Sequence, residues 1–349
     1  MKTTFISTQA ISESTRLSIA KLQLKLAGAQ KEVVTGRLAD VGLSLGYKTG
    51  ETVSLRQEYE RIRTMIDTNG VVENRLELTQ AALQAIVNAA QDFVGDLLAA
   101  RSSDSGPALV KRQAEMALSG LLDKLNTASN DAYLFAGINT DVRPVTDYFQ
   151  VPTPASRQSV ADAFFTQFGI TQSDPAVVNI TAANMQTFLD TTFAGLFDAA
   201  AWAANWSSAS DQNVRSRIST FELVETSTNA NEAAIRKLAS AFTMVADLGT
   251  ENLNQSAFYA LVDTAAQRAG EAVQELSVLQ GTLGTVQERV SIAKETMSVQ
   301  VDIIASHINL LEAVDPAEAS TRVSTLLTQL ESAYALTARL HQLSVLNYL

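Results

Sequence analysis

The pattern closest to an enzymatic motif is Gly42-Leu43-Ser44-Leu45-Gly46, which has the Gly-x-Ser-x-Gly spacing of a serine nucleophile. In such enzymes the serine lies on a sharp turn between a buried strand and a helix, and a distant histidine acts as the base. Here that base would be His307 or His341. The sequence around Ser44 lacks alternating strand and helix units, so we interpret the two glycines as turn residues that follow a helix. A cytosolic hydrolase is the alternative, and its activity would disappear in Ser44→Ala.

A second set of short patterns is similar to the three elements of penicillin-binding enzymes. They are Ser18-Ile19-Ala20-Lys21, Ser227-Thr228-Asn229 and Lys48-Thr49-Gly50. In those enzymes the Lys-Thr-Gly element comes last along the chain and lies on a strand, whereas here it precedes the Ser-x-Asn element. We interpret these matches as chance and expect no enzymatic activity.

The composition argues against several classes of binding site. The 349 residues include no cysteine, which rules out disulfides and thiolate metal sites, and the two histidines fall on different predicted helices. We therefore expect no metal and no cofactor. A net charge of −11 argues against a phosphate-binding surface, so nucleic acid is not an expected partner. No uncharged apolar run reaches membrane-spanning length and the N-terminus has no signal-peptide core, so we expect no membrane insertion and no cleavable signal peptide.

Both ends of the chain carry apolar stripes at helical spacing. Asp315-Pro316-Ala317-Glu318 predicts a helix start, with Asp315 as N-cap and Glu318 reaching back to its amide. Three- and four-residue steps then predict a face that packs along a partner helix, made by Val323, Leu326, Leu330, Ala333, Thr337 and Leu340. The opening residues have a register of the same kind: Ile6, Ala10, Leu17, Ala20, Leu24, Ala27 and Val34, beside a second stripe of Leu22, Leu26, Ala29 and Val33. We expect the two terminal helices to close into one coiled coil.

The helix predicted after Asp315 carries few charges, although an exposed helix on a lone domain normally has a charged outer face. We therefore predict that neighbouring subunits surround the terminal helices. The predicted assembly interface consists of Ile6, Ala10, Leu17, Leu24, Val323, Leu326, Leu330, Leu340 and Leu343. An ordinary intramolecular bundle is the alternative interpretation of the same stripes.

Longer helices are predicted between the two ends. One of some 50 residues ends near Leu97 and passes through a slip in the apolar register at Asn69-Gly70. Another covers about Ser256 to Val314 and continues through Gly281 and Gly284. A shorter helix is expected from about Pro107 to Ala132.

Residues 133–228 lose the heptad pattern and contain both tryptophans. We expect an inserted α+β domain there, with short strands near Val142 to Val151 and Val177 to Thr181. Its phenylalanines would form a small core of Phe164, Phe165, Phe168, Phe188, Phe193 and Phe197. Trp202 and Trp206 are more consistent with that core than with a recognition patch.

The predicted fold is mainly α, with elongated antiparallel coiled-coil or helical rods formed by the N- and C-terminal segments and a small α+β insert at the far end. The predicted domains are a terminal coiled-coil stem (1–40 and 315–349), a long-helix rod domain (41–132 and 229–314) and an inserted variable domain (133–228). Such an architecture has few concave pockets.

Several segments resemble the bacterial flagellin family. They are the run from Leu311 to Glu318, the final Leu343-Ser344-Val345-Leu346-Asn347-Tyr348-Leu349, the segment Leu283 to Arg289 and Val34-Thr35-Gly36-Arg37-Leu38. The ending Asn-Tyr-Leu and the stretch from Tyr133 to Asp141 are similar to the family's hook-associated members. The chain departs from the family at Gly46-Tyr47-Lys48-Thr49-Gly50, where an Asp-Asp pair is usual.

This resemblance implies a structural protein of the bacterial flagellum, located outside the cell. It implies a junction between hook and filament that templates flagellin assembly, with a filament-forming flagellin as the alternative. The implied partners are further copies of the chain, the first hook-filament junction protein, flagellin, the flagellar type III export apparatus and an export chaperone. A coiled-coil scaffold unrelated to motility is a third possibility, and deleting it would leave swimming intact.

Overall fold

The computed structural model describes residues 8–101 and 106–342, and most of these lie in α-helices. The helices and short helical turns are α1 (Thr8–Thr35), α2 (Val41–Leu45), η1 (Gly46–Lys48), α3 (Thr49–Ala100), α4 (Gly106–Leu125), α5 (Ala155–Phe168), η2 (Pro175–Asn179), α6 (Ala182–Phe188), η3 (Leu189–Phe193), α7 (Ala199–Asn205), α8 (Ala233–Asp247), α9 (Gln255–Glu312) and α10 (Pro316–Gln342). Two antiparallel hairpins join β1 (Ala128–Ser129) to β2 (Ala132–Tyr133) and β3 (Arg215–Arg217) to β4 (Leu223–Glu225). The predicted mainly α fold with long helices is confirmed.

The chain divides into two compact units, and α3 and α9 contribute residues to both. The terminal unit comprises Met1–Thr64 and Met297–Leu349, and the central unit comprises Met65–Thr296. The described part of the terminal unit contains α1, α2, η1, the start of α3, the end of α9 and α10.

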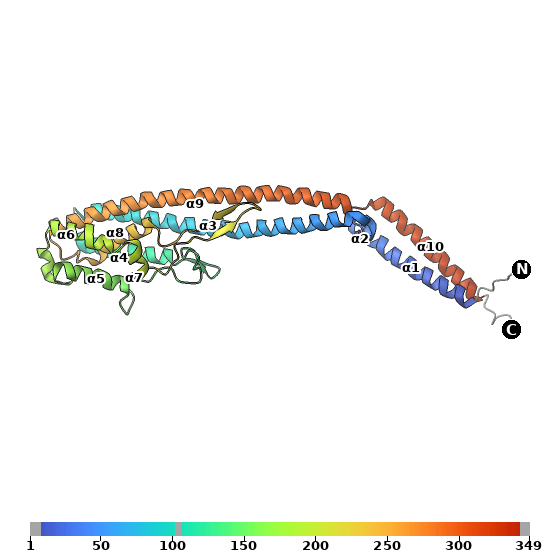
Figure 1. The fold of residues 1–349 in the computed structure, drawn as a ribbon, viewed down its shortest axis with the longest axis horizontal. Coiled ribbons are helices and arrows are strands. Elements are labelled where there is room, and N and C mark those ends of the chain that lie inside the picture. Colours follow the sequence, from blue (N-terminus) through green and yellow to red (C-terminus); the bar gives the residue numbers. More distant parts are fainter. Residues whose placement is uncertain (1–7, 102–105, 343–349) are drawn as a thin grey trace. The chain divides into compact units, whose positions relative to one another are not determined.

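In the terminal unit α1 and α10 pack side by side (Figure 1). Gln23 contacts Tyr334, and Glu32 contacts Arg322, so higher numbers on α1 meet lower numbers on α10 and the pair is antiparallel. Asp315 caps α10 by accepting from the Ala317 amide at 2.8 Å. The predicted return contact from Glu318 is wrong, because its carboxylate accepts from Arg322 at 2.8 Å instead.

The two very long helices are confirmed, and inside the central unit they contact each other. The Gln80 amide donates to the Gln280 carbonyl at 2.8 Å, and Lys294 forms an ion pair with Glu73. α9 passes through Gly281 and Gly284 without a break. α3 likewise continues through Asn69, whose buried amide donates to the Ile218 carbonyl at 2.7 Å and so fixes the β3–β4 hairpin to this helix.

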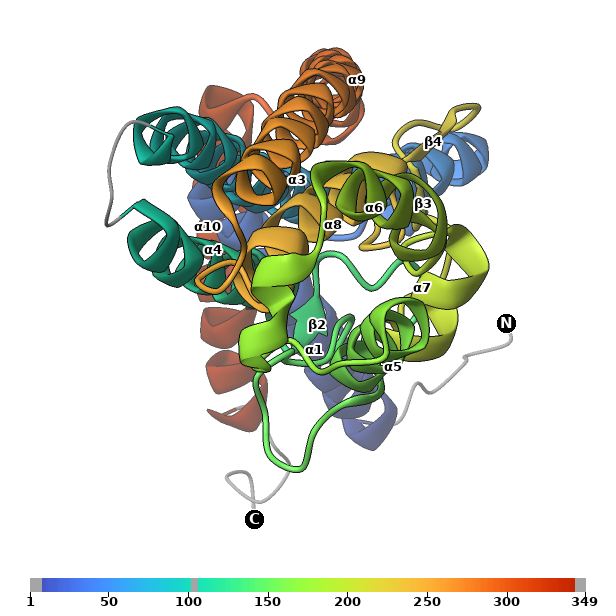
Figure 2. The ribbon, with the colours of Figure 1, turned by 90° about the vertical axis from the view of Figure 1, so that its left-hand side faces the viewer.

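The core of the central unit lies between α8 and its neighbours. α8 is buried along nearly its whole length and packs on α4 (Figure 2). Phe242 meets Phe93 of α3 edge to face, with ring centroids 4.9 Å apart. Three elements, α3, α4 and α8, thus share one apolar core.

The helix predicted over Pro107 to Ala132 ends earlier, at Leu125. Asn130 and Asp131 both have positive φ, which is the conformation of a two-residue hairpin turn that reverses the chain between β1 and β2. Asn126 exchanges two hydrogen bonds with the backbone of Val145, at 3.0 and 3.1 Å. Asn and Asp favour this left-handed geometry, and here they override the apolar periodicity of the helix.

The two strands predicted inside the insert are wrong. The first segment contains Pro144, which cannot donate to a strand ladder, and only an isolated bridge joins Val145 to Ser207. In the second, Asp174 caps the turn η2 and Pro175 occupies its first position, which is a helix-start signal. Val177 to Asn179 are therefore helical.

Aromatic rings pack in the insert as predicted, apart from Phe165, which is exposed. Trp202 and Trp206 are buried and stacked, with ring centroids 5.1 Å apart, and Tyr148 stacks on Trp206 at the same distance. The tryptophans are therefore core residues and do not form a surface recognition patch.

Candidate assembly interface

The buried side of the terminal helix pair contains small and aliphatic residues from both helices. From α10 these are Ala319 and Leu326, which are buried, and Val323, Leu330, Ala333 and Thr337, which are half-buried. This is the face predicted for the C-terminal helix. From α1 they are Ala29, which is buried, and Ile11, Ile19, Leu22 and Leu26, which are half-buried.

The first apolar register of α1, which was expected to pack on α10, lies on the side of α1 opposite to that contact. Leu17 is 57% exposed, Leu24 is 75% exposed and Val34 is 84% exposed, while Ala10, Ala20 and Ala27 are also exposed. Leu22, Leu26 and Ala29 of the second stripe make the contact instead, whereas its last member, Val33, is exposed. The expectation that the first register closes onto α10 within one subunit is therefore wrong, and the second stripe is the pairing face.

The predicted interface residues consequently fall into three groups. Val323, Leu326 and Leu330 lie inside the α1–α10 pair, where they contribute to its packing. Ala10, Leu17 and Leu24 lie on the exposed side of α1. Ile6, Leu343 and the side chain of Leu340 lie outside the described residues. The structure thus leaves one apolar face of α1 uncovered.

Further exposed apolar residues of the terminal unit were not predicted. Leu310 near the end of α9 is 79% exposed, and Leu43 and Tyr47 of the α2–η1 segment are almost fully exposed. Leu43 lies within the Gly-x-Ser-x-Gly pattern and Tyr47 directly follows it. Their signal in the sequence was the presence of large apolar residues in a short, glycine-rich connection, where polar residues are the norm.

The connection after α1 joins the break between α9 and α10 through backbone hydrogen bonds. Gly36 has φ 67° and its amide donates to the Glu32 carbonyl, so it ends α1 as predicted. The Gly36 carbonyl accepts from the Val314 amide at 3.0 Å, and the Leu38 amide donates to the Glu312 carbonyl at 2.9 Å. Arg37 and Ala313 form the bridge between these two bonds. We call residues 36–38 with 312–314 the backbone clasp.

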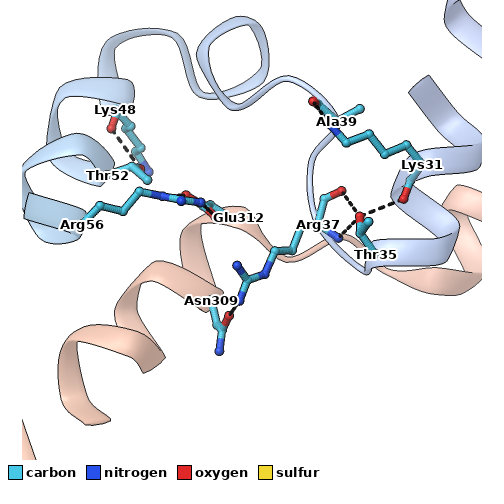
Figure 3. Close-up of polar contacts among 9 residues, drawn as sticks. All are labelled: Lys31, Thr35, Arg37, Ala39, Lys48, Thr52, Arg56, Asn309 and Glu312. Atoms are coloured by element: carbon cyan, nitrogen blue, oxygen red, sulfur yellow. Dashed lines mark hydrogen bonds and ion pairs between the residues drawn. The ribbon is translucent and has the colours of Figure 1, made fainter. Parts of the chain in front are cut away.

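Charged side chains brace the clasp (Figure 3). The Arg56 guanidinium donates to both carboxylate oxygens of Glu312, at 2.9 and 2.5 Å, and Glu312 is 1% exposed. The hydrogen bonds that Arg56 donates to Glu312, together with the negative charge of that carboxylate, raise the pKa of Arg56. Arg37 donates to Asn309 at 2.9 Å. The buried carboxylate is therefore matched by a bidentate partner, which is the strong form of this interaction.

A second buried carboxylate ties α1 to α10 and to the following connection. Glu32 accepts from Arg322 at 2.9 Å and from the Ala39 amide at 3.2 Å. Because one carboxylate holds both elements, it fixes the direction in which the chain leaves α1.

The residue with the spacing of a serine nucleophile, Ser44, lies within a short helix. This helix is α2, which Asp40 caps by accepting from the Leu43 amide at 2.9 Å. The element before it is the helix α1, so the strand that a nucleophile turn requires is missing at this position. His307 is exposed on α9, and the side chain of His341 lies outside the described residues.

In the described part of the chain, no group of three His, Asp or Glu side chains could hold a metal ion. Across those same residues, we find no helix with the length and apolar character needed to span a bilayer.

Comparisons with known proteins identify the class to which this architecture belongs. The model of the bacterial flagellin N-terminal helical region matches residues 6–140, and that of the bacterial flagellin C-terminal helical region matches residues 266–349. Together these matches span more than half of the sequence and include all the predicted interface residues. No curated protein matches the chain.

Among solved structures, the fold is similar to that of a Vibrio parahaemolyticus protein assigned as a flagellar hook-associated protein. The TM-score is 0.52 at 7% sequence identity, over 77% of this chain and 99% of the other. The chain belongs to the bacterial flagellin family. It is a structural subunit of the flagellum.

Proposed function

We propose that this protein joins the flagellar hook to the filament and presents the surface on which flagellin begins to assemble. Its copies would add to the first junction protein and to one another through the exposed face of the terminal helices. A filament-forming flagellin is the second candidate, because it would use the same helices.

The observation that carries this proposal is that little of the apolar surface in the described terminal unit is buried. Its buried apolar residues are few, namely Ala29, Ile62, Met297, Ile308, Ala319 and Leu326. The same unit exposes Leu24, Val34 and Leu310 by three quarters or more. Large exposed apolar surfaces mark sites of protein association, so this unit has the character of a subunit whose surroundings are other subunits.

The energetics favour contact with several neighbours. Burying a leucine side chain fully contributes roughly 1.5–3 kcal/mol relative to its exposed state. Association also costs at least about 4 kcal/mol in lost translational and rotational freedom. Leu17 and Leu24 in one pairwise contact would do little more than offset that cost. In a lattice each subunit contacts several others, so further apolar area is buried without a second loss of translational and rotational freedom of the same size.

The junction role rests on two segments similar to the family's hook-associated members. In the segment from Tyr133 to Asp141, Leu134, Phe135 and Ala136 are buried and Gly137 has φ 62°. A Cβ at Gly137 would lie 2.4 Å from the Ser210 carbonyl oxygen, so the glycine permits a close backbone approach. The other segment, the ending Asn347-Tyr348-Leu349, lies outside the described residues.

The proposed partners are those that the junction role requires: further copies of this chain, the first junction protein, flagellin, the flagellar export apparatus and an export chaperone. The proposed location is the extracellular flagellum. The uncovered terminal faces agree with a chain that meets its partners only after export.

The first test changes exposed leucines. Leu17→Ser with Leu24→Ser removes apolar surface that covers nothing within the subunit, so we expect normal folding and export but no filament growth. The matched control is Leu98→Ser with Leu109→Ser, which alters two leucines of the central unit with similar exposure. Circular dichroism, secreted-protein blots and electron microscopy of the hooks provide the measurements. Equal filament growth from the two double variants would count against the interface.

The second test separates the junction role from that of a flagellin. Cells lacking the protein should carry hooks without filaments and release flagellin into the medium. Removing Leu326 to Leu349 should leave a soluble protein whose central unit is folded but which cannot join the hook. If the purified full chain instead forms long filaments by itself, and is present in as many copies as a filament requires, it is a flagellin.

A further inference from the structure

A cleft of about 330 Å³ opens within the central unit, between the segment that leads into α7, the first turns of α8 and a stretch of α9. Its walls combine cations, carboxylates and a few apolar groups. The lining residues are Ala194, Phe197, Asp198, Ala233, Arg236, Lys237, Ser240, Arg268 and Glu271. The assembly proposed above makes no use of this cleft.

Two guanidinium groups of the cleft are held in place by neutral acceptors. Arg236 donates to the Phe197 carbonyl at 2.8 Å and to the Asn231 carbonyl at 3.1 Å. Arg268 donates to the Ser240 hydroxyl at 2.8 Å and to the Leu189 carbonyl at 2.7 Å. These bonds fix both side chains but leave their positive charges without a directly bonded counter-ion.

The acidic groups around the cleft offset only part of the charge of these two arginines. Glu271 contacts Lys237 at 3.0 Å, and that lysine is bonded to Glu275 as well, at 2.6 Å. Asp190 is 4.0 Å from Arg268, at the limit of an ion pair. Within the described chain Arg236 donates to backbone carbonyls, and Asp198 lines the cleft without making a capping hydrogen bond to α7. Burial lowers the pKa of Arg268, and the negative charges of Asp190 and Glu271 act in the opposite direction without cancelling the effect of burial.

α8 adds to the positive potential because its first turn, with Ala233, lies in the wall of the cleft. Glu232 at the N-cap makes no capping bond and instead accepts from the Thr228 hydroxyl at 3.2 Å. The amide end of a helix favours a negative group. Two arginines and this helix start therefore converge on one hollow, in a chain whose net charge is −11.

We propose that this hollow, which we call the Arg236–Arg268 cleft, binds a small hydroxylated carboxylate of the sugar-acid type. The carboxylate would accept charge-assisted hydrogen bonds from the guanidinium groups. Asp198 would accept from a hydroxyl of the ligand, and Phe197 with Ala194 would contact its carbon skeleton. The volume is at the small end of ligand pockets, which suits a single ring and excludes a polymer chain inside the cleft.

Glucuronate and glucose are suitable probes, because they share a ring and differ in the carboxylate. Calorimetric titration of the full-length protein at constant ionic strength should show glucuronate binding, with glucose weaker by about tenfold or more. Arg236→Gln removes one charge, and Ala233→Glu places a carboxylate in the cleft one turn before Arg236, where it would compete with the ligand for the guanidinium group. Each should weaken glucuronate binding by about tenfold or more, as expected for loss of a charged hydrogen bond.

Two variants on α4 serve as matched controls: Arg112→Gln removes an exposed arginine, and Ala108→Glu adds a glutamate to the first turn of another helix. Both should leave the affinity within about twofold, because each lies away from the cleft wall. The proposal is overturned if glucuronate does not bind, if glucose binds equally well, or if Ala233→Glu binds glucuronate like the wild type. Because Ala233 is exposed and glutamate is well tolerated in a first helical turn, folding of that variant is expected to be normal.

Discussion

Removing the Arg56 side chain should weaken the backbone clasp more than its exposure suggests. Arg56 is 53% exposed, but its partner Glu312 is 1% exposed, so Arg56→Ala leaves a buried carboxylate without its bidentate partner. Breaking a fully buried ion pair costs about 3–5 kcal/mol, whereas a surface pair contributes at most about 1 kcal/mol. Because one partner is half in water, we expect an intermediate cost of about 2 kcal/mol, which is a factor of roughly 30 in an opening equilibrium.

Hydrogen exchange is the appropriate assay, because it reports local opening. The amides of Leu38 and Val314 donate across the clasp to Glu312 and Gly36, so their protection should fall by roughly that factor in Arg56→Ala. Amides of α8 in the central unit should keep their protection. Arg61→Ala is the matched control, because Arg61 pairs with Glu58 while both side chains are more than 40% exposed. Its effect should be below about 1 kcal/mol.

A double-mutant cycle tests the cause. If the buried charge of Glu312 is responsible, adding Glu312→Gln to Arg56→Ala should restore part of the lost protection, since a neutral amide is less costly to bury. Equal exchange in Arg56→Ala and Arg61→Ala would refute the reasoning. So would a double variant that opens more readily than Arg56→Ala alone.

Three further predictions concern the central unit. Gly137→Ala should destabilise the central unit by at least about 3 kcal/mol in urea unfolding, because the new Cβ would meet the Ser210 and Gln212 carbonyl oxygens. The control Gly169→Ala has a similar φ but open space around its Cβ, so it should cost about 1 kcal/mol. Equal losses of stability in the two variants would contradict this explanation. Trp202→Ala should lower the free energy of unfolding by about 3–5 kcal/mol because the ring is fully buried. Tryptophan fluorescence during unfolding measures this loss, and a loss below about 1 kcal/mol would count against the aromatic core. The pKa of Tyr148 is raised well above its ordinary value by burial, by the negative charge of Asp247 and by the hydrogen bond to that carboxylate. The folded state therefore binds the phenolic proton more tightly than the unfolded state does, and stability should fall as the pH rises beyond about 10. Tyr148→Phe should show a shallower alkaline loss in thermal scans, and an unchanged slope would contradict the assignment.

The long helices were predictable because each has many apolar residues in one register. In α9 the apolar positions continue through Gly281 and Gly284, and two glycines weaken a helix by only about 1 kcal/mol each. Packing along a partner helix outweighs that loss. The end of α1 at Gly36 and the start of α10 at Asp315 followed equally from local capping chemistry.

The insert was less predictable because its structure depends on single polar residues and distant contacts. Asn126 holds Val145 through two hydrogen bonds, and Asn231 connects Trp202 to the backbone of Ala209. Neither partner can be inferred from the local sequence. The strand-like composition of Val142 to Val151 therefore produced a wrong prediction, although the aromatic core was correctly identified.

The register of α1 shows why periodicity alone cannot assign an interface. Leu17 and Leu24 belong to one stripe and Leu22 with Leu26 to another, and both have the spacing of a packed face. Periodicity identifies stripes without saying which partner covers each, and only the second stripe lies toward α10. A helix with two apolar stripes and one partner in its own subunit leaves the first stripe uncovered. In the proposed assembly, α1 uses one face to pair with α10, and the uncovered stripe would contact a neighbouring copy. If the proposal is correct, Leu22 serves folding and Leu24 serves assembly, although they lie only two positions apart on the same helix.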